Sequence, residues 1–214
     1  MLFNIGTTDI ASNSTGVSRL AANAIHDVKF DGCEAVTIDK KDGTASFDVL
    51  RVKFKNDDGV FEHVIFEPKA GDEVRQKNQF DSENPSNVEN LLFTLKHLLA
   101  AVAPTVAKQI EDKGLAVEGW NGDKGLRNFM VKNTTKAIGT DTQIKLLSNK
   151  DNNAVFPGFP LGMSKEGNVY PRTNFIGKDL KFTAKEIERM NSVASATPST
   201  PAVAVKADDD DLIF

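Results

Sequence analysis

Residues 46–67 read SFDVLRVKFKNDDGVFEHVIFE and contain two strand patterns separated by a turn. From Ser46 to Lys55, apolar and polar residues alternate, which is typical of a strand with one buried face. The segment Asn56–Gly59 is rich in turn-forming residues, and Val60–Glu67 is again strand-like. The pattern therefore predicts an antiparallel pair of strands. The face expected to be buried in the first of them carries Leu50, Val52 and Phe54.

An earlier strand is predicted over Ile25–Ile38, before the turn at Lys41–Gly43. The pair Asp31-Gly32 interrupts its pattern, and a glycine within a strand indicates a bulge or bend. Together with the two strands above, this segment predicts a three-stranded antiparallel meander.

The clearest helix in the sequence begins near Ser86. Ser86 and Glu89 have the spacing of a capping box, in which each side chain bonds the backbone N–H of the other residue. Pro104 is expected to kink this helix or to begin a second one that ends at Gly114. The apolar positions recur at helical spacing: Val88, Leu91, Leu92, Leu95, Leu98, Leu99 and Val102.

The later elements are less regular. We expect a weak helix over Asp123–Lys136, a strand over Thr142–Ser148, one or two strands within Ala154–Ile176, and a closing helix over Thr183–Met190. The order of three strands, a helix and about two strands predicts a mainly β, α+β fold. It is the order of a five-stranded Greek-key barrel of the OB type, with a long helix between its third and fourth strands.

Composition divides the chain into a body and a tail. With 214 residues and 40% apolar content, we expect one domain over residues 1–190. Residues 191–207 consist mostly of Ser, Ala, Thr, Pro and Val, which predicts a flexible, disordered linker before the tip at 208–214. One lysine and four aspartates give residues 191–214 a charge of −3, so the body carries only −1 of the net −4.

Several classes of protein are excluded by the sequence pattern. No apolar run approaches the roughly 18 residues of a membrane span, and Met1–Asp9 lacks the layout of a signal peptide. We therefore expect a cytosolic protein. The single cysteine and three histidines show no metal-ligand spacing, and no nucleophile or phosphate-loop motif is present. We therefore expect no metal site, no cofactor and no enzymatic activity.

The last seven residues are Asp208-Asp209-Asp210-Asp211-Leu212-Ile213-Phe214. Four adjacent aspartates stay hydrated, whereas the three terminal apolar residues are expected to need a partner that covers them. An apolar pocket with a basic rim would suit this tip, with the aspartates steering the approach. A solubilising acidic end and a divalent-metal cluster are the alternatives.

This tip resembles the C-terminus of bacterial single-stranded DNA-binding proteins, which end in aspartates, two apolar residues and Phe. Ile213 stands where those proteins have Pro, and the linker is shorter, so a phage-encoded member of this kind fits better than a bacterial one. The resemblance implies that Asp208–Phe214 recruits replication, recombination and repair proteins such as polymerase, primase or helicase. It implies that the body binds and protects single-stranded DNA.

The body contains the residue types that such binding needs, because unpaired bases stack on aromatic rings and phosphates pair with Lys and Arg. We expect a binding face on the second and third strands, extended by a loop and by the later aromatic region. The candidates are Lys40, Lys41, Phe47, Arg51, Lys53, Lys55, Lys145, Lys150, Phe156, Phe159, Tyr170, Arg172 and Phe175.

Two other functions remain open at this point. The chain could be a protein–protein adaptor or virion component whose tail is a sorting signal. It could also be a polymerase accessory factor that prefers primer junctions. A homo-oligomer is compatible with each of these functions.

Overall fold

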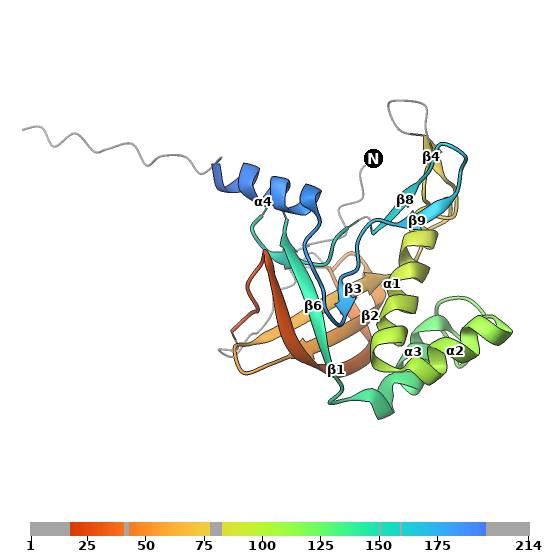
Figure 1. Cartoon of the computed structure of the whole chain (residues 1–214). Coiled ribbons are helices and arrows are strands. Elements are labelled where there is room, and N and C mark those ends of the chain that lie inside the picture. Colours follow the sequence, from red (N-terminus) through yellow and green to blue (C-terminus); the bar gives the residue numbers. More distant parts are fainter. Residues whose placement is uncertain (1–17, 41–42, 78–82, 150, 159, 196–214) are drawn as a thin grey trace, which may run out of the picture.

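The computed structural model describes residues 18–40, 43–77, 83–149, 151–158 and 160–195. A curled antiparallel sheet forms half of a barrel, and the helices lie around it (Figure 1). The chain is thus a mixed α and β protein. The order across the main sheet is β10-β6-β1-β2-β3, with β7 paired to β6. Its strands are β1 (Ala24–Asp39), β2 (Ser46–Lys55), β3 (Val60–Phe66), β6 (Asp141–Ser148), β7 (Ala154–Val155) and β10 (Ile176–Gly177).

Strand β1 changes its partner along its length. Its first part, Ala24–Lys29, pairs with β6, and the part from Lys29 to Asp39 pairs with β2. The register with β2 shifts between Phe30 and Gly32, where Gly32 has a φ of 112°. Only glycine adopts this angle without strain, so the bulge bends the strand and curls the sheet.

Helices fill the connection between β3 and β6. They are α1 (Asn87–Val102), α2 (Pro104–Lys113), α3 (Leu126–Thr134) and a 3₁₀ turn (Thr135–Ala137). The capping box at the start of α1 is complete, because Ser86 Oγ accepts from Glu89 N–H and the Glu89 carboxylate accepts from Ser86 N–H. Within the described residues, no helix has the length and apolar content that a membrane span requires.

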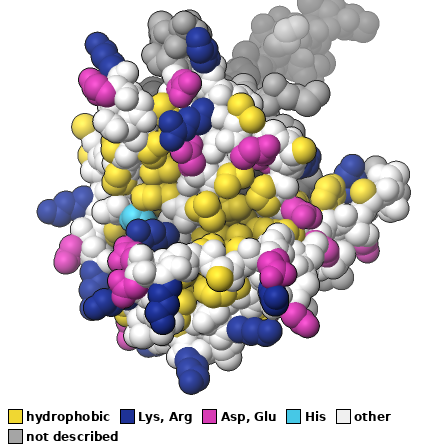
Figure 2. Space-filling view, turned by 90° about the vertical axis from the view of Figure 1, so that its right-hand side faces the viewer, with side chains coloured by type: hydrophobic (Ala, Val, Ile, Leu, Met, Phe, Trp, Pro, Cys, Tyr) yellow, Lys and Arg dark blue, Asp and Glu magenta, His cyan; other side chains and the backbone are white. Residues whose placement is uncertain are grey.

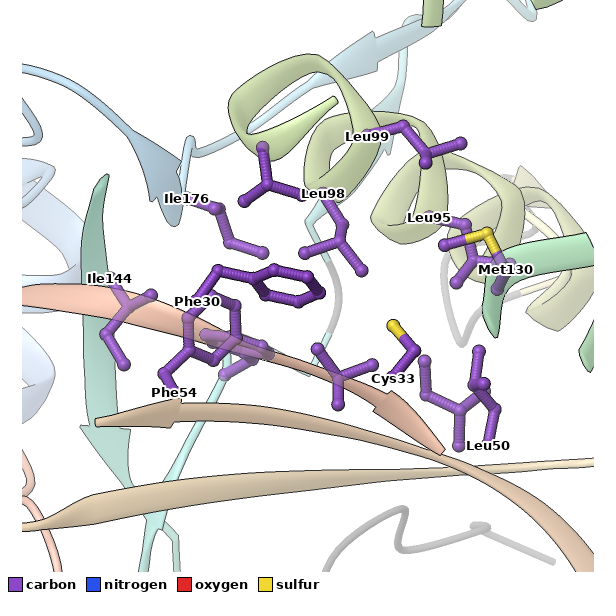
Figure 3. Close-up of a cluster of buried hydrophobic side chains, with 14 of the residues drawn as sticks. Phe30, Cys33, Leu50, Phe54, Leu95, Leu98, Leu99, Met130, Ile144 and Ile176 are labelled. Carbon is purple, nitrogen blue, oxygen red and sulfur yellow. The ribbon is translucent and has the colours of Figure 1, made fainter. Parts of the chain in front are cut away.

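The core lies between α1 and the concave side of the sheet (Figure 3). Leu95 and Leu98 project from α1 toward the strands (Figure 3), and Leu99 of the same helix is also buried. Phe30 and Phe54 meet edge to face from β1 and β2, with ring centroids 5.7 Å apart, and both rings are fully buried. The alternation of β2 thus places Leu50, Val52 and Phe54 inside.

Two small hairpins lie outside the main sheet. They are β4 (Gln76–Lys77) with β5 (Glu83–Asn84), and β8 (Leu161–Met163) with β9 (Val169–Pro171). Figure 1 shows β4, β8 and β9 near the N-terminal end of α1. Helix α4 (Ala184–Ser195) follows β10 and lies at the other side of the sheet (Figure 1).

Most expected elements of the body are confirmed. The second strand has the expected bounds, the bulge at Gly32 is present, and Pro104 begins a second helix that Gly114 ends. The closing helix is longer than expected, because α4 continues past Met190 to Ser195. Small residues such as Ala and Ser can continue a helix that has already formed, and the first proline after Met190 is Pro198.

Lys145 on β6 is fully buried and holds α4 to the sheet. Its Nζ donates to Glu186 Oε2 at 2.8 Å, to the Lys181 carbonyl at 3.0 Å and to the Thr173 hydroxyl. Glu186 also accepts from Thr183 N–H at 2.7 Å, which completes the expected cap of α4. Burial alone would raise the pKa of Glu186, but the hydrogen bonds from Lys145, Thr183 and Thr173 outweigh it and lower that pKa.

Replacing Lys145 by Met should therefore destabilise the fold strongly, because Glu186 is left with a buried and unpaired charge. We expect a loss of about 3–5 kcal/mol in the free energy of unfolding, measured by urea denaturation. The double variant Lys145→Met/Glu186→Leu should recover most of this loss. The exposed Lys185 is the matched control; a Lys145→Met variant as stable as Lys185→Ala would contradict the assignment.

His63 is a second titratable group at the edge of the core. It lies on the inner face of β3, with its ring centroid 4.9 Å from that of Phe156. Burial lowers the pKa of His63 to about 4 from an ordinary value of 6.5. Between these values the unfolded chain binds a proton that the folded chain does not, so stability falls as the pH drops through this window.

His63→Gln should accordingly reduce the pH dependence of stability between pH 6.5 and 4. The wild-type protein should lose roughly 3 kcal/mol more than the variant over this window, since each unit of pKa difference corresponds to about 1.4 kcal/mol. Urea denaturation of both proteins at the two pH values measures the difference. Equal losses would show that His63 titrates normally in the folded protein.

Candidate nucleic-acid interface

The outer face of β1, β2 and β3 carries a row of basic side chains. Because side chains alternate along β2, Arg51, Lys53 and Lys55 project away from the core. Cross-strand pairing places Glu34 of β1 opposite Arg51, and Glu62 of β3 opposite Lys53. The three basic residues therefore lie in line along one strand, with acidic residues on both sides.

Each of these basic residues has an acidic neighbour. Lys53 Nζ lies 2.5 Å from Glu34 Oε1, and Lys55 Nζ lies 2.5 Å from Asp31 Oδ1. Pairs that remain partly exposed to solvent contribute little to stability, about 0–1 kcal/mol each at the surface, so a phosphate can compete with the carboxylates. The face is thus neutral when free.

Arg51 is held less closely than the two lysines. Its Nε lies 3.8 Å from Glu62 Oε2, and its nearest approach to Glu34 is 4.0 Å. The Nε atom is buried and makes no hydrogen bond within the described part of the chain. Arg51 is therefore paired only loosely with the two carboxylates beside it.

Two aromatic rings lie beyond the charged row on the same face. Phe47 and Phe66 meet edge to face, with centroids 5.8 Å apart. Lys40 Nζ lies 5.5 Å from the centroid of Phe47. Both phenylalanines are partly exposed. The structure therefore brings Lys40 and Phe47 to the same surface as Arg51, Lys53 and Lys55.

Three of the candidate residues are buried, which corrects the placement expected from the sequence. Lys145 is fully buried in the ion pair with Glu186, and Phe175 and Phe156 belong to the core. Phe156 packs edge to face on Phe61, with centroids 4.8 Å apart. The prolines around Phe156 favour an exposed loop or rim, but the ring of Phe156 belongs to the core.

Tyr170 and Arg172 are exposed and lie on the β8–β9 hairpin, away from the basic row of β2. The remaining candidates, Lys41, Lys150 and Phe159, fall outside the described residues. The tip Asp208–Phe214 also falls outside them.

A groove of about 570 Å³ adjoins the basic row at Lys55. Lys29, Lys55 and Lys178 line it together with four aspartates, and Lys29 Nζ pairs with Asp141 Oδ1 at 2.7 Å. No sequence pattern singles out Lys29 or Lys178, because they come from different elements that meet only in the folded chain. The acidic groups in the groove are Asp27, Asp57, Asp141 and Asp179.

Comparison of the chain with protein-family models, with curated proteins and with solved structures gives no match. The functional assignment therefore depends on the surfaces of this chain. No group of His, Cys, Asp and Glu in the described ranges is placed to hold a metal ion.

The face that carries α1 and α2 has a different character. Figure 2 shows hydrophobic side chains gathered at its centre, with acidic and basic residues mixed around them. Leu92 on α1 is 42% exposed, and Lys96 of α1 pairs with Glu111 of α2 at 2.8 Å. This face lacks the line of basic residues beside aromatic rings that β2 presents.

Proposed function

We propose that this chain binds single-stranded DNA on the outer face of β1, β2 and β3. The observation that carries the proposal is the row Arg51, Lys53 and Lys55 beside the partly exposed ring of Phe47. Cations in line can follow a phosphate backbone, and rings beside them can stack with bases without reading the sequence. The ion pairs with acidic neighbours keep the face neutral until phosphates replace the carboxylates.

The finer fold assignment is part of the same proposal. A long, bulged first strand pairs with the second strand and with the strand that follows the helices, and a helix packs in the core between the third and that later strand. This order supports an OB-type Greek-key barrel. Barrels of this type use the face of strands two and three for oligonucleotides, which is where the basic row lies.

The C-terminal tip supplies the second half of the proposed function. Asp208–Phe214 combines four negative charges with a terminal aromatic residue, which suits docking to a basic, apolar pocket on a partner protein. In this proposal the body protects exposed strands in the cytoplasm, and the tip recruits replication, recombination and repair proteins. The protein acts by binding, without catalysis or a cofactor.

The Lys53–Glu34 ion pair allows a test in which two substitutions have opposite effects. Both Lys53→Gln and Glu34→Gln remove the same ion pair, so a purely structural role predicts the same sign for both. If the face binds phosphate, Lys53→Gln should weaken binding to fluorescent oligothymidylate, and Glu34→Gln should strengthen it. Fluorescence anisotropy at several salt concentrations measures both affinities.

The salt dependence supplies a further readout. The slope of log affinity against log salt should decrease by about 0.7 in Lys53→Gln, since one phosphate contact is lost. Lys96→Gln is the matched control, because Lys96 is also ion-paired but lies on the α1–α2 face. Absence of binding by the wild-type chain at low salt, or equal effects of Lys53→Gln and Lys96→Gln, would refute the proposal.

A further inference from the structure

The β8–β9 hairpin places two exposed side chains over a glycine. Tyr170 of β9 pairs directly with Gly162 of β8, and Arg172 lies just after the end of β9. A β-carbon at position 162 would lie 2.7 Å from Tyr170 Cζ and 2.6 Å from Arg172 Nε. A β-carbon at these distances would force Tyr170 or Arg172 to shift, so both side chains occupy the space that a larger residue would fill.

Gly162 therefore leaves room for both side chains, and Gly162, Tyr170 and Arg172 together form a surface that we call the hairpin platform. Gly162 is buried beneath the two side chains, whereas Tyr170 keeps 45% of its surface exposed and Arg172 is also exposed. Within the described ranges, the Arg172 guanidinium has no hydrogen-bond or ion-pair partner. An open aromatic ring thus lies beside a cation that no carboxylate of the described chain neutralises. In this respect the platform differs from the β2 row.

The platform is held on a well-anchored hairpin. Leu161 N–H donates to Asn90 Oδ1 of α1 at 3.3 Å, and Arg172 N–H donates to the Pro160 carbonyl at 2.7 Å. At the other end, Ser164 N–H donates to the Asn168 carbonyl at 2.8 Å and closes the turn. Binding groups held in place in advance lose less conformational entropy when a ligand arrives.

We infer that the β8–β9 hairpin is a second contact for the polynucleotide, separate from the β2 row. The exposed face of Tyr170 stacks with one unpaired base, and Arg172 binds the neighbouring phosphate. Gly162 is a positioning residue that allows both side chains to lie flat. This inference rests on the proposed function and adds to it a named stacking residue. Any base can stack on the face of an aromatic ring, so this contact does not depend on the DNA sequence.

The chain contains a single tyrosine and a single tryptophan, which makes the inference directly observable. Full-length protein labelled with 3-fluorotyrosine should give one ¹⁹F resonance, from Tyr170, and stacking with oligothymidylate should move it upfield. Trp120 is buried and donates to the Asp48 carbonyl at 2.9 Å, so its fluorescence reports whether the fold is unchanged. Tyr170→Ala should weaken binding about 5-fold to 150-fold, the effect of one stacked base, while Tyr170→Phe should retain it.

Two glycines, Gly162 and Gly158, provide a matched pair of variants. Gly162→Ala should lower the affinity and shift the ¹⁹F resonance of the free protein, whereas Gly158→Ala should do neither, since a β-carbon at 158 meets no atom within 4 Å. If anisotropy shows binding but the resonance stays in place and Tyr170→Ala binds normally, the inference is overturned while the proposed function stands. If the wild-type protein does not bind at all, both are overturned.

Discussion

Strand β1 pairs with β6 through its first part and with β2 through its second, and the backbone bulge at Gly32 lies just after the point where the partner changes. A β-branched or bulky residue there would be strained at a φ of 112°, and its β-carbon would meet Ile138 at 3.4 Å. The bend turns an otherwise flat sheet into a half-barrel with a concave side that α1 fills. On the outer face of the sheet, Arg51, Lys53 and Lys55 lie in line along β2, and the buried Val49 separates them from Phe47.

The lysine in the interior and the lysines on the outer face have different environments. The buried Lys145 ammonium binds Glu186, the Thr173 hydroxyl and the Lys181 carbonyl, and these contacts attach α4 to the sheet. On the outer face, Lys53 and Lys55 have one carboxylate each and remain in contact with water. A ligand can compete for the second kind of lysine but cannot reach the first. The hairpin platform adds a third arrangement, in which Arg172 has no acidic partner among the described residues.

Periodicity and capping chemistry predicted the meander, its bulge, and the helices that begin at Ser86 and Pro104, because these signals lie within a few residues of each other. Contacts between distant residues left no such signal. Lys145 reads as a surface residue of a strand, since its partner Glu186 follows 41 residues later. Phe156 reads as part of a rim because prolines surround it. Tyr170 was a candidate from its residue type alone, while its pairing with Gly162 depends on a register that the sequence does not reveal.

If unpaired DNA binds to the outer face of β2, as proposed, the backbone amides of that strand can report the binding residue by residue. The most direct measurement is a titration of ¹⁵N-labelled protein with oligothymidylate, followed by two-dimensional NMR. We expect the largest shifts at Phe47, Arg51 and Lys53, with little change along α2. Largest shifts along α1 and α2, or no shifts at low salt, would contradict it.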